Sequence, residues 1–283
     1  MKLMSFEIGG RASYGLCTDA GVIDLGRRLG ATAPTLRELL ALPDWQALAR
    51  SHADAKADHA LAALTPLPVI PQPRTIACVG HNYEEHRVET QRDPTEHPSI
   101  FFRHPESLQG SGVALVRPRE STQLDYEGEL AIVIGRGGRR IAQDDAWAHI
   151  AGVSCFNDGS VRDWQHHTRQ FGPGKNFAGT AGFGPALVTL DELPADRVLS
   201  LQTRVNGKVV QQARTDQMIF PIPRLVAYVS TFMTLVPGDV IVTGTPGGVG
   251  VKRVPPLWLQ PGDLVEVEIS SVGVLSNGVV QEA

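Results

Sequence analysis

Residues 125–134 read DYEGELAIVI and join three closely spaced carboxylates to an apolar run. The apolar half predicts a buried strand, which we expect to extend over residues 124–134. Because side chains two residues apart share one face of a strand, Asp125, Glu127 and Glu129 should crowd together beside the core. Such carboxylates repel one another and resist desolvation unless a cation neutralises them. Hard oxygen ligands favour Mg²⁺, Mn²⁺ or Ca²⁺. A solvated face on an edge strand is the alternative that this stretch leaves open.

The composition of the chain is that of an ordinary globular protein. Its 283 residues are 42% apolar and 20% charged, and 30 acidic against 26 basic residues give a net charge of −4. The absence of a long basic run argues against a nucleic-acid partner. Three scattered cysteines suit neither a disulfide framework nor a zinc site and favour a reducing compartment. No segment has the pattern of a signal peptide or membrane span, so we expect a cytoplasmic protein without a membrane partner.

Proline and glycine positions predict the domain organisation. The 29 glycines and 20 prolines indicate many turns and therefore a strand-rich fold. Four prolines within residues 65–74 exclude a helix or a central strand, and we predict a linker there. It would separate a small N-terminal α+β region, residues 1–64, from a larger domain at 75–283.

Local patterns predict the elements of both parts. We expect N-terminal strands at 3–8, 13–17 and 22–25, followed by helical segments from residue 35 to residue 64. Asn206-Gly207 predicts a tight hairpin turn, and apolar residues at helical spacing predict a helix within 225–236. Further helices are expected at 83–90 and 144–149. Further strands are expected at 75–79, 152–156, 199–205, 208–213, 239–243 and 264–269.

A second group of polar residues follows the predicted strand at 152–156. Asp158 alone would most simply be a turn residue. Arg162 and Gln165 come directly after it, and Lys175 follows soon after. A cation site surrounded by arginine, glutamine and lysine could hold an anionic substrate that chelates the metal.

His86 and Glu89 form the third candidate. They are three residues apart in a segment predicted to be helical, so their side chains share a face and can form a hydrogen bond. A histidine oriented by a carboxylate is a common general base near neutral pH. An ordinary surface pair is the alternative. Residues 243–250, TGTPGGVG, are glycine-rich but do not fit the phosphate-binding pattern G-x-x-x-x-G-K-[ST], so no nucleotide site is predicted.

Taken in order, these motifs resemble the fumarylacetoacetate hydrolase family, in its branch of acylpyruvases and 2-hydroxyhepta-2,4-diene-1,7-dioate isomerases. The resemblance covers nearly all of residues 74–280. The matching stretches are 79–83 (VGHNY), 125–131 (DYEGELA), 157–165 (NDGSVRDWQ), 174–177 (GKNF), 205–207 (VNG) with Gln211, Thr215 and Met218, and 234–239 (TLVPGD) leading into 243–250.

The resemblance implies a mixed β-rich α+β fold, the family's β-sandwich roll, usually assembled as a homodimer. It implies that Glu127, Glu129 and Asp158 bind Mg²⁺ or Mn²⁺, with Asp125 behind them. By the same resemblance, Arg162, Gln165, Lys175 and Thr245 hold a small 2-oxo acid substrate. His86 and Glu89 would then be the water-activating pair on a mobile lid, and Lys175 would assist catalysis.

Two departures from the family pattern affect substrate fit. The family often has a lysine in the segment where this chain reads Phe101-Phe102-Arg103-His104, and an aspartate where it has Ala178. The implied reaction is hydrolysis of a carbon–carbon bond in a 2,4-dioxo acid through an enolate. Isomerisation or decarboxylation of muconate-type or oxaloacetate-type diacids is the alternative at the same site. A third, from a different class, is a protein that binds the metal without catalysis.

Overall fold

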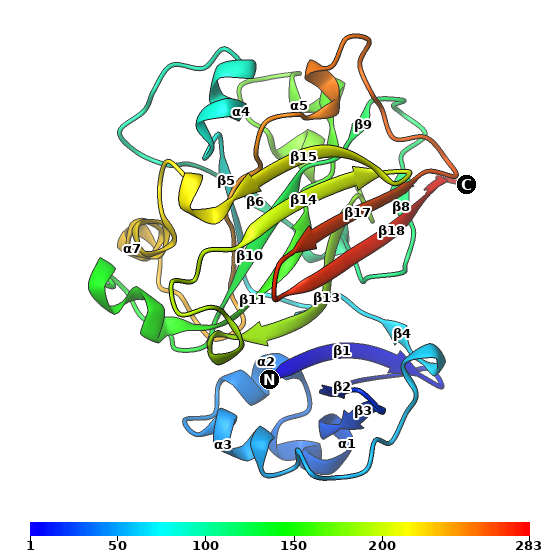
Figure 1. Ribbon diagram of the computed structural model, residues 1–283, viewed down its shortest axis with the longest axis vertical. Helices are drawn as coiled ribbons and strands as arrows, with labels where there is room; N and C mark the ends of the chain where they lie inside the picture. Colours follow the sequence, from blue (N-terminus) through cyan, green and yellow to red (C-terminus); the bar gives the residue numbers. More distant parts are fainter.

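The computed structural model describes all 283 residues and contains two main sheets (Figure 1). The larger is a mixed, 11-stranded sheet with the order β3-β2-β1-β13-β11-β10-β16-β5-β6, to which β4 and β7 add at the sides. The smaller has five strands in the order β15-β14-β17-β18-β8. The strands of the larger sheet are β1 Lys2–Ile8, β2 Arg11–Thr18, β3 Gly21–Asp24, β4 Thr65–Pro66, β5 Ile76–Gly80, β6 Ser99–Arg103, β7 Leu108–Gln109, β10 Gly128–Ile134, β11 Ile150–Asn157, β13 Ala181–Thr189 and β16 Val240–Val242.

The smaller sheet packs against the larger one and confirms the hairpin. Asn206 and Gly207 join β14 to β15 with φ values of 51° and 76°, as a tight turn between twisted strands requires. The strands of this sheet are β8 Leu115–Arg117, β14 Ser200–Val205, β15 Lys208–Arg214, β17 Leu264–Ile269 and β18 Gly273–Gln281. The longest strands that the sequence patterns do not predict are β13 and β18, and the shorter β6 and β8 are not predicted either.

Helices are short, and the longest closes the core between the sheets. Helix α7 (Ile222–Phe232) begins after Pro221 and buries Leu225, Val226 and Val229 in the same core as side chains of β10 and β11. This confirms the helix that the apolar spacing predicts, although it begins and ends a few residues earlier than expected. None of the helices is long and apolar enough to span a bilayer. The other α-helices are α1 Leu25–Leu29, α2 Leu36–Leu40, α3 Trp45–Arg50, α4 Glu84–Glu89, α5 Arg162–Gln165 and α6 Gly172–Lys175.

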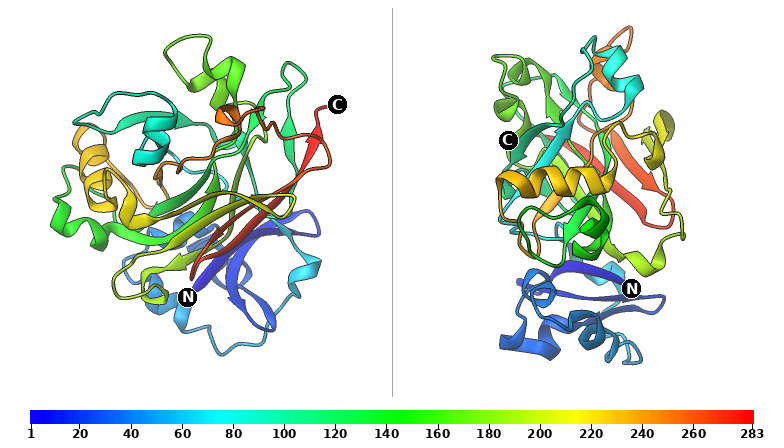
Figure 2. Two further views of the ribbon diagram at one scale, coloured as in Figure 1. Left: turned by 45° about the horizontal axis from the view of Figure 1, so that its top comes forward. Right: turned by 90° about the vertical axis from the view of Figure 1, so that its left-hand side faces the viewer.

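The N-terminal residues extend the larger sheet. Strand β1 pairs antiparallel with β13, with Lys2 opposite Val188, and the helices α1 to α3 cover one face of a second apolar core. Thr35 caps α2 by accepting a hydrogen bond from the Glu38 amide, as the sequence predicts. The helical prediction beyond residue 50 is wrong, because residues 51–60 form turns and a bridge to Val22. Figure 2 shows this N-terminal part at one end of the molecule and α4 at the other.

The long strand predicted at 124–134 is interrupted at its acidic end. Strand β9 covers only Leu124–Asp125 and pairs with β12 (Ser160–Val161), whereas β10 begins at Gly128 and pairs with β11. The two halves of the predicted strand therefore pair with different partners: β10 pairs with β11, which precedes Asp158, and β9 pairs with β12, which follows it. The Glu127 amide donates to Asn157 Oδ1, and the Asp158 amide donates to the Glu127 carbonyl. The break therefore places Glu127 beside Asp158.

Candidate active site

Three buried carboxylates converge at this break. Each of Glu127, Glu129 and Asp158 offers an oxygen, and these oxygens all lie within 4.8 Å of one another. Glu127 comes from the segment between β9 and β10, Glu129 from β10, and Asp158 from the turn between β11 and β12. Three carboxylate oxygens without nitrogen or sulfur form a donor set that fits Mg²⁺ or Mn²⁺.

Asp125 does not share this cluster, so the expectation that Asp125, Glu127 and Glu129 crowd one strand face is wrong. The interruption after β9 removes the alternation on which that expectation rests. Asp125 instead accepts hydrogen bonds from Arg162 Nε at 2.8 Å and from the amides of Gly250 at 2.8 Å and Val251 at 2.9 Å. It thereby ties Arg162 to the loop after β16.

Buried cations offset most of the acidic charge. Lys175 Nζ lies 2.6 Å from Glu127 Oε2 and 2.5 Å from Asp158 Oδ2. Arg162 Nη2 forms an ion pair with Glu127 Oε1 at 2.6 Å, and Arg103 Nη1 donates to Asp158 Oδ1 at 2.6 Å. With Asp125, four buried carboxylates face three cations. Glu129 alone has no cationic partner, since its hydrogen bond comes from the Gly244 amide.

The pKa shifts follow this distribution of partners. Burial raises the pKa of Glu129 well above its usual range, and the charges of Asp158 and Glu127 add to the shift. Burial also disfavours the charge on Glu127, but Arg162 and Lys175 hold its pKa far below the ordinary value. A cation bound beside Glu129 would therefore relieve the strongest uncompensated charge in the cluster.

The predicted pair of His86 and Glu89 forms on α4. His86 Nδ1 lies 2.7 Å from Glu89 Oε1, and the Gly248 amide donates to Glu89 Oε2 at 3.0 Å. The loop that follows β16 thus fixes the carboxylate, which in turn fixes the buried imidazole. His81 stacks on His86 with ring centroids 5.4 Å apart. Burial lowers the pKa of His81 to about 4, and His86 adds to the shift, so this second ring is neutral near pH 7.

Thr245 and Gln165 are both held by polar contacts. Thr245 Oγ1 accepts from Gln211 Nε2 at 2.8 Å and donates to the Gly128 carbonyl at 3.0 Å. Gln165 Oε1 accepts from Arg162 Nη1 at 2.8 Å. These contacts leave neither side chain free to rotate without loss of a buried hydrogen bond.

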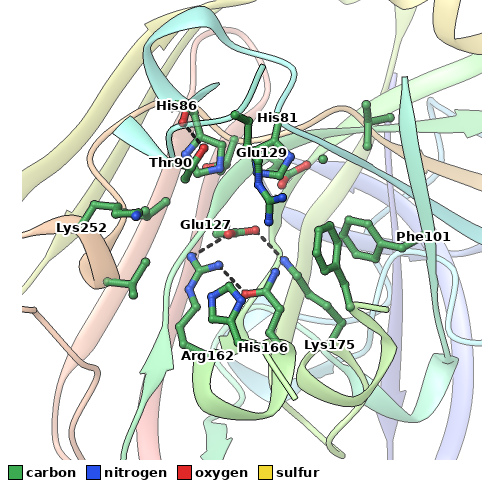
Figure 3. Close-up of a pocket in the computed structure, with 18 residues that line it drawn as sticks. His81, His86, Thr90, Phe101, Glu127, Glu129, Arg162, His166, Lys175 and Lys252 are labelled. Carbon is green, nitrogen blue, oxygen red and sulfur yellow. Dashed lines mark hydrogen bonds and ion pairs between the residues drawn. The ribbon is translucent and has the colours of Figure 1, made fainter. Parts of the chain in front are cut away.

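One cavity of about 110 Å³ joins these groups (Figure 3). The structure brings seven of the nine predicted site residues to its wall, while Asp158 and Glu89 lie just behind their partners Lys175 and His86. The seven are His86, Glu127, Glu129, Arg162, Gln165, Lys175 and Thr245.

Sequence reasoning misses several residues of this site. Arg103 belongs to the stretch 101–104 that departs from the family pattern, and no local pattern marks it as a partner of Asp158. It is the last residue of β6 and is buried there. No sequence motif singles out His166, which is exposed and also lines the cavity. Arg92 and Lys252 also line it, and no local pattern distinguishes them from other exposed cations.

Comparison with known proteins relates the chain to one enzyme family. The family model described as fumarylacetoacetate (FAA) hydrolase C-terminal matches residues 75–280. The chain is 44% identical over 219 residues to the mitochondrial oxaloacetate tautomerase FAHD2A of Homo sapiens, which covers 77% of this chain and 70% of that protein. It is 42% identical over 214 residues to the oxaloacetate tautomerase YisK of Bacillus subtilis, covering 74% of this chain and 71% of that protein.

Solved structures of the same kind superpose over the whole chain. Fumarylacetoacetate hydrolase from Exiguobacterium antarcticum has a TM-score of 0.82 at 33% identity, covering 100% of both chains. The 2-hydroxyhepta-2,4-diene-1,7-dioate isomerase from Mycobacterium marinum has a TM-score of 0.78 at 30% identity, covering 100% of this chain and 99% of that one. Maleylpyruvate hydrolase from Sphingobium sp. SYK-6, in complex with manganese(II) and pyruvate, has a TM-score of 0.82 at 27% identity, covering 100% of both.

Proposed function

This chain belongs to the fumarylacetoacetate hydrolase family, and we propose that it is a divalent-metal-dependent tautomerase that interconverts the keto and enol forms of oxaloacetate. The observation that carries the proposal is that the carboxylate cluster and the His86–Glu89 pair open onto one cavity. The cluster suits chelation of a 2-oxo acid, and the pair suits proton transfer beside it. The two oxaloacetate tautomerases above 40% identity support this choice of reaction.

Glu127, Glu129 and Asp158 would hold the ion. The maleylpyruvate hydrolase structure with manganese(II) supports Mn²⁺ as one ion for this kind of site, and the all-oxygen donor set suits Mg²⁺ equally well. When bound, it would supply Lewis-acid polarisation of the substrate's 2-oxo group.

The chain's own cations would stabilise the charge that develops. Burial opposes the ammonium of Lys175, but Asp158 and Glu127 raise its pKa, so it stays charged at neutral pH. Arg162 is likewise kept charged by Glu127 and Asp125. Both line the cavity, and their positive charge would offset the negative charge on the substrate when C3 loses a proton. Gln165 and Thr245 would orient the carboxylate end of the substrate.

His86 would move the proton. Glu89 occupies Nδ1, which leaves Nε2 as the free ring nitrogen. We assign His86 Nε2 the removal of the C3 proton from the keto form and the transfer of that proton to the 2-oxygen of the resulting enolate, with the same two transfers in reverse order from the enol. Glu89 would orient the ring and stabilise its protonated form. No atom is lost or gained in this step, because tautomerisation only shifts one proton from carbon to the 2-oxygen.

The test is a direct assay of enol–ketone exchange of oxaloacetate by ultraviolet absorbance with Mg²⁺ or Mn²⁺. We expect turnover in the wild type, loss of it on chelation, and a large loss in Glu127→Gln and His86→Gln. An unchanged rate of exchange in both variants would refute the roles of Glu127 as a metal ligand and of His86 as the base.

Carbon–carbon bond hydrolysis of 2,4-dioxo acids is the second candidate. It is favoured by the same His86–Glu89 pair, which could activate a water molecule instead of the C3 proton. Likeness to maleylpyruvate hydrolase supports it at lower identity. A panel of acylpyruvates with a coupled assay for released pyruvate distinguishes the two, because a tautomerase releases none. Isomerisation of muconate-type diacids would give neither signal and would be followed by the spectrum of the conjugated diene.

A further inference from the structure

Two cationic side chains line the cavity without forming an ion pair with any carboxylate of the chain. Arg92 and Lys252 both line it, and neither side chain takes part in an ion pair or hydrogen bond within the structure. The other two cations of the wall are engaged, Arg162 with Asp125 and Glu127, and Lys175 with Glu127 and Asp158.

The two free cations come from segments that are far apart in the chain. Arg92 follows α4 in the chain, and its backbone is tied to the helix because the Arg92 amide donates to the Arg87 carbonyl. Lys252 ends the 3-10 helix η7 (Gly250–Lys252), directly after the loop that holds Glu89 and Asp125. In Figure 3, Lys252 lies across the cavity from Phe101 and Lys175. Positive charge is therefore present at a part of the wall remote from the Lys175 side.

Neither cation has an ion-pair partner, although Glu84 and Asp93 line an adjoining cavity together with Arg92. The only carboxylates that line the cavity of the candidate site are Glu127 and Glu129, which belong to the metal-binding cluster. The positive charge of Arg92 and Lys252 also affects two histidines of the cavity wall. Burial lowers the pKa of both His81 and His166, and Arg92 lowers both further, while Lys252 contributes at His166. Cations that line one cavity without an ion-pair partner favour an anion inside that cavity.

We infer that Arg92 and Lys252 bind the second carboxylate of a 2-oxo diacid whose first carboxylate and 2-oxo group lie at the Glu127–Glu129–Asp158 cluster. This inference rests on the proposed function and names the residues that select a dianion over a monoanion. Arg92 also lines the adjoining cavity, which has a volume of about 410 Å³. The two residues are specificity determinants, and the proton transfer is assigned to neither.

The first arm of the test is steady-state kinetics with oxaloacetate in the presence of Mn²⁺. We expect Arg92→Gln and Lys252→Gln each to raise KM about fivefold with little change in kcat, since an exposed charge pair contributes at most about 1 kcal/mol. Arg92→Lys and Lys252→Arg should restore most of the affinity. Lys208→Gln, which removes an exposed cation at the β14–β15 hairpin, is the matched control and should leave KM unchanged.

The second arm does not depend on turnover. Calorimetry on the Mn²⁺-loaded protein compares 2-oxoglutarate with 2-oxopentanoate, which differ only in whether the distal end is a carboxylate or a methyl group. We expect the wild type to prefer the diacid and the double variant Arg92→Gln/Lys252→Gln to bind both alike. If the preference is absent in the wild type, or survives in the double variant, the inference is overturned. If the wild type prefers the diacid and the double variant does not, but oxaloacetate is not turned over, the roles of Arg92 and Lys252 are supported and the proposed tautomerase activity is refuted.

Discussion

Arg103 Nη1 lies 2.6 Å from Asp158 Oδ1, and both side chains are almost fully buried. The same guanidinium donates to the Gly159 carbonyl at 3.1 Å and to Thr180 Oγ1 at 3.0 Å. Because Lys175 contacts the other oxygen of Asp158 at 2.5 Å, this carboxylate is held on both sides. Arg103 touches no wall of the cavity, so its role is to position a candidate metal ligand.

Replacement of Arg103 by methionine should destabilise the fold. It leaves the buried Asp158 short of one partner, and breaking a buried pair in this way costs about 3–5 kcal/mol. Urea denaturation of the metal-free protein measures the loss. Arg119→Met, at a side chain that is 68% exposed, is the control and should change the free energy of unfolding by less than about 0.5 kcal/mol. Equal effects of the two substitutions would contradict the positioning role.

Glu129→Gln should stabilise the metal-free protein. The folded-state pKa of Glu129 is raised, chiefly by burial, above the ordinary value of about 4.3. An acid with a raised folded-state pKa binds its proton more tightly when folded, so its ionisation costs stability, and the cost grows as the pH rises from the unfolded-state pKa towards the folded-state one. The variant should therefore melt higher than the wild type at about pH 8 and nearly equally at about pH 4.

The same substitution should remove the response to metal. In the wild type, a divalent ion at about 100 times its Kd should add about 2.7 kcal/mol to the free energy of unfolding. Thermal scans with Mn²⁺ and with EDTA measure this in both proteins. A wild type that does not respond to Mn²⁺, or a variant that responds as strongly, would argue against Glu129 as a ligand.

The His86–Glu89 pair should control the rate of proton transfer. His86→Gln removes the base and should lower kcat by about a hundredfold, within the usual contribution of general base catalysis. Glu89→Gln keeps a hydrogen-bond acceptor for His86 but loses the charge, so we expect a smaller loss. His97→Gln, in the same segment but outside the cavity wall, is the control. The expectation fails if His86→Gln and His97→Gln have the same kcat.

Gly128→Ala should disturb both the fold and the metal site. A Cβ at this position would clash with Thr203 Oγ1, so the buried Thr203 side chain or one of the two strands must shift. Overpacking of this kind costs about 1–3 kcal/mol, and the shift would separate Glu127 from Glu129. Melting temperature and Mn²⁺ affinity should fall together. Adding Thr203→Ala should recover part of both, whereas recovery of neither would place the cause elsewhere.

Much of the secondary structure could be predicted because it depends on local pattern. Alternation and turn residues identify β1, β2, β3, β14, β15 and β17, and helical spacing identifies α4 and α7. Strands β13 and β18 escape such patterns, since glycines, a proline and polar residues interrupt their apolar runs. Their pairing with distant strands, β13 with β1 and β18 with β8, stabilises them instead.

The structure of the acidic stretch at 125–129 could not be predicted from local sequence pattern. Regular alternation predicts one continuous strand, but β9 and β10 pair with different partners, and Asp125 leaves the cluster as a result. The residue types at 125–129 and 157–158 are visible in the chain. Their arrangement depends on tertiary hydrogen bonds such as the one from the Glu127 amide to Asn157.

The sequence by itself determined the family, the strand-rich fold class and the identity of the candidate catalytic and metal-binding side chains. Those conclusions rest on residue types at fixed spacings, which are a property of the chain alone. Only the tertiary structure decided that Arg103 supports Asp158, that Glu129 lacks a cation, and that Arg92 and Lys252 face the cavity unpaired. Electrostatic partnership depends on distance and burial in space, and residues far apart in the chain acquire both only when it folds.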